Sequence, residues 1–256
     1  MLDKSTLTSS TPSHRQAHEI AKFDQLAEEW RNDNGRFKHI SAFNRCRVRC
    51  IVERIIDHFQ LQSASDKPLA GFNILDVGCG AGLICEALAA LGATVTGIDG
   101  SETNIEVAKR NASANKLSID YQHALAEHML TTRKSACFDV VLNTEVIEHV
   151  DDQQTLTNTC ASLTHSNGLL VMATLNRTLK SFFVAIIGAE YLLNMLPKGT
   201  HDWRWFVRPS QLEQWLQPHQ FSTTQLVGLS YNLVTKNWRI TDDSSVNYLL
   251  FASRQQ

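Results

Sequence analysis

Long apolar runs are missing from this chain of 256 residues. No stretch of about 18 consecutive apolar residues occurs, so the sequence offers no membrane-spanning helix. The N-terminus has no apolar secretory core, and we find no targeting peptide in it. The six cysteines are scattered and form no CxxC pair of the kind that holds a structural metal. These absences predict a protein of a reducing, cytoplasmic compartment.

Net charge is also nearly absent, at −2 for the whole chain. Bulk charge therefore does not favour nucleic acid, and we expect no nucleic-acid partner. We find no internal repeat. Hydrophobic residues make up 43% of the chain and charged residues 20%, which is ordinary for a globular protein long enough for one well-buried α/β domain.

Composition and periodicity divide the chain into three parts. Residues 1–16 are rich in serine and threonine, and we predict a disordered tail there. Amphipathic helical patterns predict an N-terminal helical cap over residues 17–66, with one helix from about Asn44 to Phe59. Strands alternate with helices in the remaining part, residues 67–256, which we expect to form the main domain.

The alternation predicts a Rossmann-like α/β fold with a mostly parallel sheet and helices on both faces. After Trp203 the pattern changes, and two β-like runs are expected to close the sheet as a C-terminal antiparallel hairpin. The predicted sheet has seven strands, at about 73–77, 94–98, 119–122, 138–143, 169–173, 223–231 and 245–253.

A glycine-rich turn follows the first of these strands. Glycines at 78, 80 and 82 let the backbone turn tightly and let a ligand approach closely. The spacing GxGxG lacks one residue of the dinucleotide pattern GxGxxG, which disfavours a pyrophosphate and a nicotinamide oxidoreductase. Asp76 precedes the turn, and Asp99 ends the second strand, where a carboxylate can accept both hydroxyls of a ribose. The alternative is a tight strand–helix turn without a ligand.

This combination resembles the class I methyltransferases that depend on S-adenosylmethionine (SAM). The resemblance implies that Asp99 holds the ribose and that Gly78 and Gly80 line the cofactor. It also implies that the residues after the third strand, Ala126 among them, flank the adenine. Thr144, with Asn143, would face the methionine end, and Asp76 would belong to the cofactor site.

An acid–histidine cluster, Glu145, Glu148 and His149, follows the fourth strand directly. In a helix these spacings share one face, at the carboxyl end of the sheet where such folds bind ligands. Two carboxylates and an imidazole are three ligands for a divalent ion such as Mg²⁺. Alternatively, His149 acts as a metal-free general base. The third possibility is a solvated helix start without a catalytic role.

The chemistry would be methyl transfer to an oxygen. A phenol is mostly protonated at neutral pH, because its pKa is near 10. A metal ion or His149 would remove that obstacle. The cluster therefore favours an O-methyltransferase that acts on a phenol over one that methylates an amine.

An apolar insert spans about residues 177–202, and its most apolar part runs from Phe182 to Leu196. It is too short and too interrupted to cross a bilayer. Arg177, Lys180 and Lys198 flank it, which favours an interfacial helix or a lid over an apolar substrate. The alternative is a helix packed into the core.

Several further motifs narrow the resemblance to the ubiquinone-pathway O-methyltransferases. The match covers about residues 19–250 and nearly the whole chain. The matching segments are Ile20–Phe23, Thr174–Arg177, Gly188–Tyr191, Pro197–Asp202, Gly228–Asn232 and Val246–Tyr248.

This resemblance implies methylation of ring hydroxyls on polyprenylated phenol or catechol intermediates, in both O-methylation steps of the pathway. It implies that Glu145, Glu148 and His149 hold a divalent metal, and that Arg47 contacts the carboxylate of the cofactor, with Arg45 and Arg49 as neighbouring alternatives. It also implies peripheral contact with an anionic inner-membrane surface, and other ubiquinone-biosynthesis proteins as possible partners.

Four departures from the family pattern are visible: Ala81, Gly100, Thr144 and the extra basic residues of the segment Asn44–Cys50. Two other functions stay open at the level of the sequence. One is an O-methyltransferase for another hydrophobic phenol. The other is a non-catalytic lipid-binding partner that keeps a relic cofactor fold, and the complete glycine–aspartate and acid–histidine sets argue against it.

Overall fold

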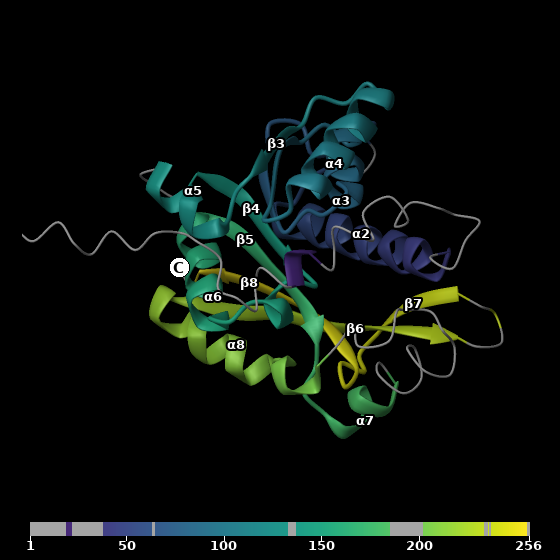
Figure 1. The fold of residues 1–256 in the computed structure, drawn as a ribbon, viewed down its shortest axis with the longest axis vertical. Coiled ribbons are helices and arrows are strands. Elements are labelled where there is room, and N and C mark those ends of the chain that lie inside the picture. The colour runs from purple at the N-terminus through teal and green to yellow at the C-terminus, as the bar shows by residue number, and fades with distance from the viewer. Residues whose placement is uncertain are drawn as a thin grey trace, which may run out of the picture.

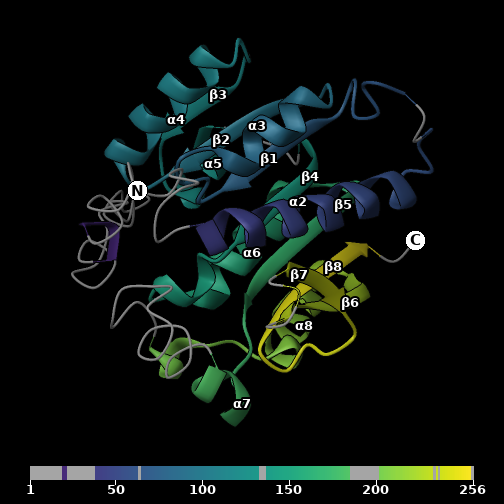
Figure 2. The ribbon, with the colours of Figure 1, turned by 90° about the vertical axis from the view of Figure 1, so that its right-hand side faces the viewer.

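A computed structural model describes seven segments of the chain, at residues 19–21, 38–62, 65–132, 137–184, 202–232, 235 and 237–254. Figures 1 and 2 show a central twisted sheet with helices packed on both sides. The predicted tail at 1–16 lies outside the described residues, as does most of the apolar insert.

The sheet has eight strands in the order β3-β2-β1-β4-β5-β8-β6-β7. The first five strands of this order run parallel, and β8 pairs antiparallel with both β5 and β6. The strands are β1 Asn73–Val77, β2 Thr94–Asp99, β3 Asp120–His123, β4 Phe138–Thr144, β5 Thr164–Leu175, β6 Phe221–Asn232, β7 Asn237–Thr241 and β8 Asn247–Arg254.

The predicted fold class is confirmed, but the number of strands was wrong by one. The polar connection between the last two predicted strands contains β7, which pairs antiparallel with β6. Trp238 and Ile240 of β7 pack against the core beside α2, and this tertiary contact stabilises a strand that its polar neighbours conceal in the sequence.

Helices cover the sheet in two layers. The α-helices are α2 Lys38–His58, α3 Leu83–Ala90, α4 Glu102–Ala114, α5 Ala126–Thr132, α6 Gln153–Leu163, α7 Leu179–Ser181 and α8 Pro209–Leu216. Helices α2, α3 and α4 share one buried cluster with one face of the sheet, and α5, α6 and α8 share a second cluster with the other face. The described residues also form three short 3-10 helices: η2 Ile147–His149, η4 Trp203–Trp205 and η5 Gln217–His219.

The central strands are apolar on both faces because both faces are covered. In β4, Val140 and Leu142 pack into the first cluster while Val141 packs into the second, as the period of two in a strand requires. The acids Asp76 and Asp99 lie at or near the carboxyl ends of their strands. The strand order reverses between β1 and β4, and at that point an open α/β sheet leaves a crevice for a ligand.

Two predicted helices differ in their bounds. The helix expected from Asn44 begins earlier, at Lys38. The helical segment expected directly after β4 is interrupted, because η2 ends at His149 and α6 begins only at Gln153, where Asp152 caps it. Within the described residues, no helix is long and apolar enough to span a bilayer.

Candidate active site

The glycine-rich turn at the end of β1 is the tight turn that the glycines predicted, and its backbone is left-handed at all three of them. Gly78, Gly80 and Gly82 have φ values of 77°, 53° and 83°. A Cβ at Gly78 would lie 2.2 Å from Cγ2 of Val146, so the turn packs directly against the segment after β4. This contact brings the glycine motif and the acid–histidine motif to one edge of the sheet.

Asp99 lies at the carboxyl end of β2 and is fixed to the same turn. Its Oδ2 accepts a hydrogen bond from the Gly80 amide at 2.9 Å, and its Oδ1 accepts from the Ser101 amide at 2.8 Å. A carboxylate oxygen can accept more than one hydrogen bond. The Asn104 side chain also donates to Oδ1, at 3.4 Å, so backbone amides and Asn104 together set the orientation of Asp99.

Asp76 is an acid of β1 that is only 1% exposed. The Cys85 thiol donates to its Oδ2 at 3.3 Å, while no described residue forms a hydrogen bond with Oδ1. Burial raises the pKa of Asp76 to about 6, against the smaller opposing effects of the Cys85 hydrogen bond and the Arg47 charge. A buried acceptor with an open oxygen fits a donor group on a ligand.

Arg47 is the one of three neighbouring arginines of α2 that faces the sheet edge. It is 6% exposed, and it forms an ion pair with Glu145 at 3.3 Å and a hydrogen bond to Asn44 at 2.6 Å. Burial lowers its pKa, and the charges of Glu145, Asp76 and Glu148 oppose that shift. Its Nε has no hydrogen-bond partner among the described residues.

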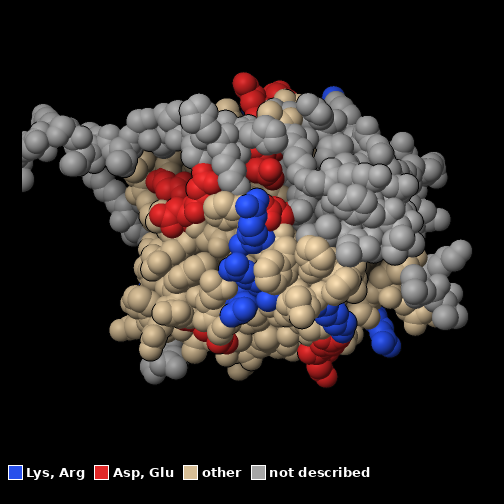
Figure 3. Space-filling model, turned by 60° about the horizontal axis from the view of Figure 1, so that its bottom comes forward, with Lys and Arg blue, Asp and Glu red and all other residues tan. Residues whose placement is uncertain are grey.

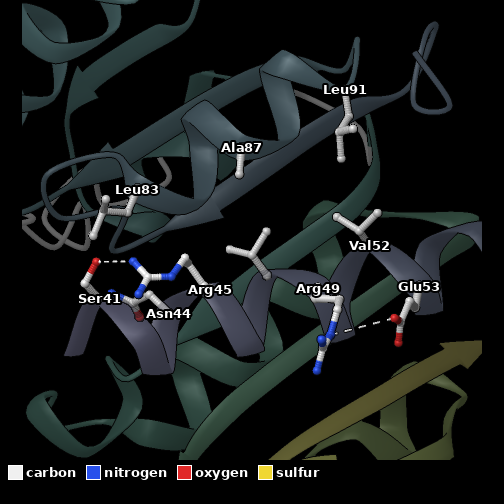
Figure 4. Close-up of a pocket in the computed structure, with 10 residues that line it drawn as sticks. Ser41, Asn44, Arg45, Arg49, Val52, Glu53, Leu83, Ala87 and Leu91 are labelled. Atoms are coloured by element: carbon white, nitrogen blue, oxygen red, sulfur yellow. Dashed lines mark hydrogen bonds and ion pairs between the residues drawn. The ribbon is translucent and has the colours of Figure 1, made fainter. Parts of the chain in front are cut away.

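The other two arginines line a groove of about 520 Å³ between α2 and α3 (Figure 4). Arg45 donates to Ser41 at 2.8 Å, and Arg49 pairs with Glu53 at 3.9 Å. Both side chains are exposed, whereas Arg47 is buried, and Asn44 lines the same groove.

Glu145 stands where β4 ends and the chain turns. Its φ of 57° is left-handed, which is unusual for a residue with a side chain and is typical of functional sites. The Glu145 amide donates to the Ala173 carbonyl at 2.8 Å, which holds this turn against β5.

Glu148 is 3% exposed and accepts a hydrogen bond from the Thr174 hydroxyl at 2.8 Å. Burial, followed by the negative charge of Glu145, raises the pKa of Glu148 to about 8. Burial in this position therefore disfavours the charged form of its carboxyl group.

His149 ends the 3-10 turn η2. Its Nδ1 lies 2.6 Å from Oε2 of Glu19, a residue 130 positions earlier in the chain. Both side chains are largely buried, with 12% exposure for His149 and 17% for Glu19.

The comparisons with known proteins agree with this geometry. Residues 75–172 match a family described as "Methyltransferase domain". The chain is 48% identical over 231 residues to the ubiquinone biosynthesis O-methyltransferase of Pelagibacter ubique, over 90% of this chain and 95% of that protein. It is 43% identical over 238 residues to the protein of the same name from a Chelativorans species, over 93% of each.

The chain belongs to the ubiquinone biosynthesis O-methyltransferase family. The family resemblance predicted from the motifs is thereby confirmed. Among solved structures, the fold is similar to magnesium protoporphyrin IX methyltransferase from Synechocystis with bound S-adenosylhomocysteine (SAH), with a TM-score of 0.67, 18% identity, and coverage of 94% of this chain and 98% of that one. At this identity the likeness supports the class I methyltransferase fold alone.

The metal site predicted for this family member is not formed in the structure. The expected shared helix face is absent, because Glu145 precedes η2 in a left-handed turn. Glu145 pairs with Arg47, Glu148 with Thr174 and His149 with Glu19. Across the described segments, no three His, Cys, Asp or Glu side chains converge to hold a metal ion. These three residues in this arrangement do not fit a divalent ion.

The remaining predicted cofactor residues lie at the same edge. Thr144, 6% exposed, is the last residue of β4, and Ala126, 4% exposed, begins α5. The Ala124 amide donates to the Asp99 carbonyl at 3.0 Å, so the loop before α5 is held beside Asp99. The cofactor roles of Thr144 and Ala126 stay predictions.

Sequence reasoning missed the partners of the predicted residues. Glu19 contacts His149, Asn44 accepts from Arg47, and Thr174 donates to Glu148. Glu19 and Thr174 are distant in the sequence from their partners, and Asn44 lies on a helix face whose pattern indicated only amphipathicity. Asn143 is fully buried, and its amide donates to the Val77 carbonyl at 3.3 Å while its Oδ1 has no described partner. The family resemblance had placed Asn143 at the methionine end of the cofactor, and the structure adds that its Oδ1 is buried at this edge of the sheet.

The raised pKa of Asp76 gives a pH dependence with a definite sign. The folded protein binds a proton at Asp76 up to about pH 6, whereas the unfolded chain releases it near the ordinary value of 3.8. The free energy of unfolding of the ligand-free protein should therefore fall as pH rises from about 4 to about 7, by about 3 kcal/mol for this group.

Asp76→Asn should remove this pH dependence of the free energy of unfolding, while the amide oxygen of asparagine can still accept the hydrogen bond from Cys85. Urea unfolding at several pH values between 4.5 and 7.5 measures it, with the exposed acid variant Asp120→Asn as control. Parallel pH curves for the wild-type protein and Asp76→Asn would show that the buried carboxyl group titrates normally.

Proposed function

We propose that this protein transfers the methyl group of SAM to a ring hydroxyl of a polyprenylated phenol or catechol, in both O-methylation steps of ubiquinone biosynthesis. The similarity to curated relatives of that name over nine-tenths of the chain supports the pathway. The observation that supports the chemistry best is the set of polar atoms at the sheet edge that are buried and incompletely hydrogen-bonded.

These atoms complement an amino acid. The Arg47 Nε is a charged donor, and the Oδ1 atoms of Asp76 and Asn143 are acceptors, and all three are buried without a described partner. Buried polar groups are ordinarily hydrogen-bonded, and a ligand commonly satisfies those that are not. The carboxylate of the methionine end of SAM would bind Arg47, and the ammonium group would donate to the acceptors.

The adenosine end would lie across the glycine turn. Gly80 has no described atom within 4 Å of where a Cβ would stand, which leaves its backbone open to a ligand. Asp99, oriented by backbone amides, would accept the ribose hydroxyls, and Ala126 would flank the adenine. SAM supplies an activated methyl group, so the protein mainly has to align the acceptor oxygen and accept its proton.

His149 is the best of the three predicted catalytic residues to accept that proton. Burial raises the pKa of Glu148 and so disfavours its charged form, and the charge of Glu145 is balanced by Arg47. An imidazole is suited to general base catalysis because its ordinary pKa is near neutrality. Glu145 and Glu148 would then shape the site electrostatically, and no step requires a divalent metal.

Contact with an anionic membrane surface would bring a polyprenylated substrate within reach. The start of the apolar insert exposes three large hydrophobic side chains: Leu179 at 73%, Phe183 at 59% and Val184 at 48%. The basic residues Arg177 and Lys180 lie beside them in the chain. Figure 3 shows a row of basic side chains on one face of the molecule, with acidic side chains beside its upper end. Other ubiquinone-biosynthesis proteins are further candidate partners.

Turnover is the direct test of this proposal. The purified protein with SAM and a prenylated catechol should yield SAH and the ring methyl ether, measured by mass spectrometry, and excess EDTA should leave the rate unchanged. His149→Gln should lower kcat by about 10²- to 10⁴-fold. Loss of activity in EDTA would favour the metal hypothesis, and methylation of unprenylated phenols alone would favour a different substrate class.

The cofactor role of Arg47 can be tested against its neighbours on α2. Arg47→Lys should weaken SAH binding about 10- to 100-fold, because a planar donor set is lost from a buried site. Isothermal titration calorimetry measures the affinity, and Arg45→Lys and Arg49→Lys serve as matched controls. Equal SAH affinities for all three variants would show that Arg47 does not bind the cofactor.

Membrane contact can be tested by co-sedimentation with liposomes that contain anionic lipid. Replacing Leu179, Phe183 and Val184 by serine should reduce binding about tenfold or more, because three exposed apolar side chains no longer enter the interface. Leu130→Ser is the control, since Leu130 is also exposed, at 38%, but belongs to α5. Unchanged binding of the triple variant would place the contact elsewhere.

A further inference from the structure

A short helical turn at residues 19–21 lies against the candidate active site. The active-site residue that it contacts, His149, is 130 positions away in the sequence. Figures 1 and 2 draw it as the short purple helix near one end of the sheet. Glu19 reaches His149, with 2.6 Å between Oε2 and Nδ1. The amphipathic pattern of this segment predicted a helix but did not assign Glu19 any role.

We propose that Glu19 is a positioning residue for His149, which it holds in one tautomer and one orientation. This inference rests on the proposed function, in which His149 accepts the proton of the substrate hydroxyl. It adds a second residue to that step, contributed by the N-terminal part of the chain.

The argument follows from the chemistry of the two groups. An ionised carboxylate can only accept hydrogen bonds, so the ring nitrogen that faces it must carry a hydrogen. With Nδ1 protonated, the neutral ring accepts a proton at Nε2. The short distance and partial burial are typical of a charge-assisted hydrogen bond that is weakly screened by solvent. The opposite tautomer would present an N–H to the substrate hydroxyl and could not act as base.

The same arrangement is used by catalytic triads, in which a carboxylate orients a histidine without itself accepting the proton. There, the loss of the carboxylate charge leaves the geometry intact and lowers the rate because the wrong tautomer becomes populated. We expect a smaller effect here, since Glu19 is 17% exposed and water can replace part of its hydrogen bonding.

A second contact fixes the turn that carries Glu19. A Cβ at Gly100 would lie 2.9 Å from Cδ1 of Ile20 and 3.2 Å from Cδ2 of Leu125. The glycine that departs from the family pattern thus leaves room for Ile20 beside Asp99. The turn is therefore anchored on the proposed ribose side, and Glu19 extends from it toward the proposed acceptor side.

The test uses the full-length protein and the substitution Glu19→Gln. A glutamine amide can accept from or donate to Nδ1, so it no longer selects a tautomer. We expect kcat for the prenylated catechol to fall about 10- to 100-fold, while the affinity for SAH and the thermal midpoint change little. Glu19→Asp should recover part of the rate, and Glu53→Gln, an exposed acid of α2, is the control.

An independent readout does not need turnover. Long-range ¹⁵N–¹H spectra of histidine-labelled protein, with His149→Gln to assign the signal, should show His149 protonated at Nδ1 in the wild-type protein. In Glu19→Gln the signal should shift toward a mixture of both tautomers.

The two measurements separate the failure of this inference from the failure of the proposed function. A wild-type kcat in Glu19→Gln, or an unchanged tautomer, would overturn the positioning role even if the wild-type protein methylates phenols. Parallel losses of kcat, SAH affinity and thermal stability would also overturn it, because they would show a merely structural contact. If the wild-type protein methylated no phenol, the spectra would still decide whether Glu19 sets the tautomer.

Discussion

The buried guanidinium of Arg47 is the charge on which the acids of the sheet edge depend. A charge removed from water costs several kcal/mol unless it is paired, and here Glu145 and Asn44 provide the partners. The same cation acts on Asp76 from across the edge. One side chain of α2 thereby connects the N-terminal helix to the ends of β1 and β4.

The parallel sheet explains why polar groups gather at this place and not within it. Its central strands are covered by helices on both faces, so a polar side chain inside a strand would be buried without a partner. The carboxyl ends of the strands are not covered in this way, so polar side chains can lie there. The strand order reverses between β1 and β4, and the loops that follow these two strands therefore diverge. The contact between Gly78 and Val146 is the point where these two loops meet.

The acid–histidine cluster shows how far spacing can predict chemistry. Its place at the sheet edge followed correctly from the strand before it. The shared helix face did not form, because the Glu145 amide bonds to β5 and the chain turns left-handed before η2 begins. The three side chains that spacing grouped as metal ligands consequently have Arg47, Thr174 and Glu19 as partners, and burial disfavours the charged form of one of them, Glu148.

The sequence by itself determined the fold class, the cofactor turn and the family, because these depend on local periodicity, glycine spacing and motifs that a linear chain displays. It also singled out Asp76, Asp99 and Arg47 as candidates. Only the tertiary structure decided that Arg47 faces inward while Arg45 does not, that β7 is a strand, and that Glu19 meets His149. Such pairings join residues up to 130 positions apart, and they form because the whole fold brings those side chains together, which no local pattern encodes.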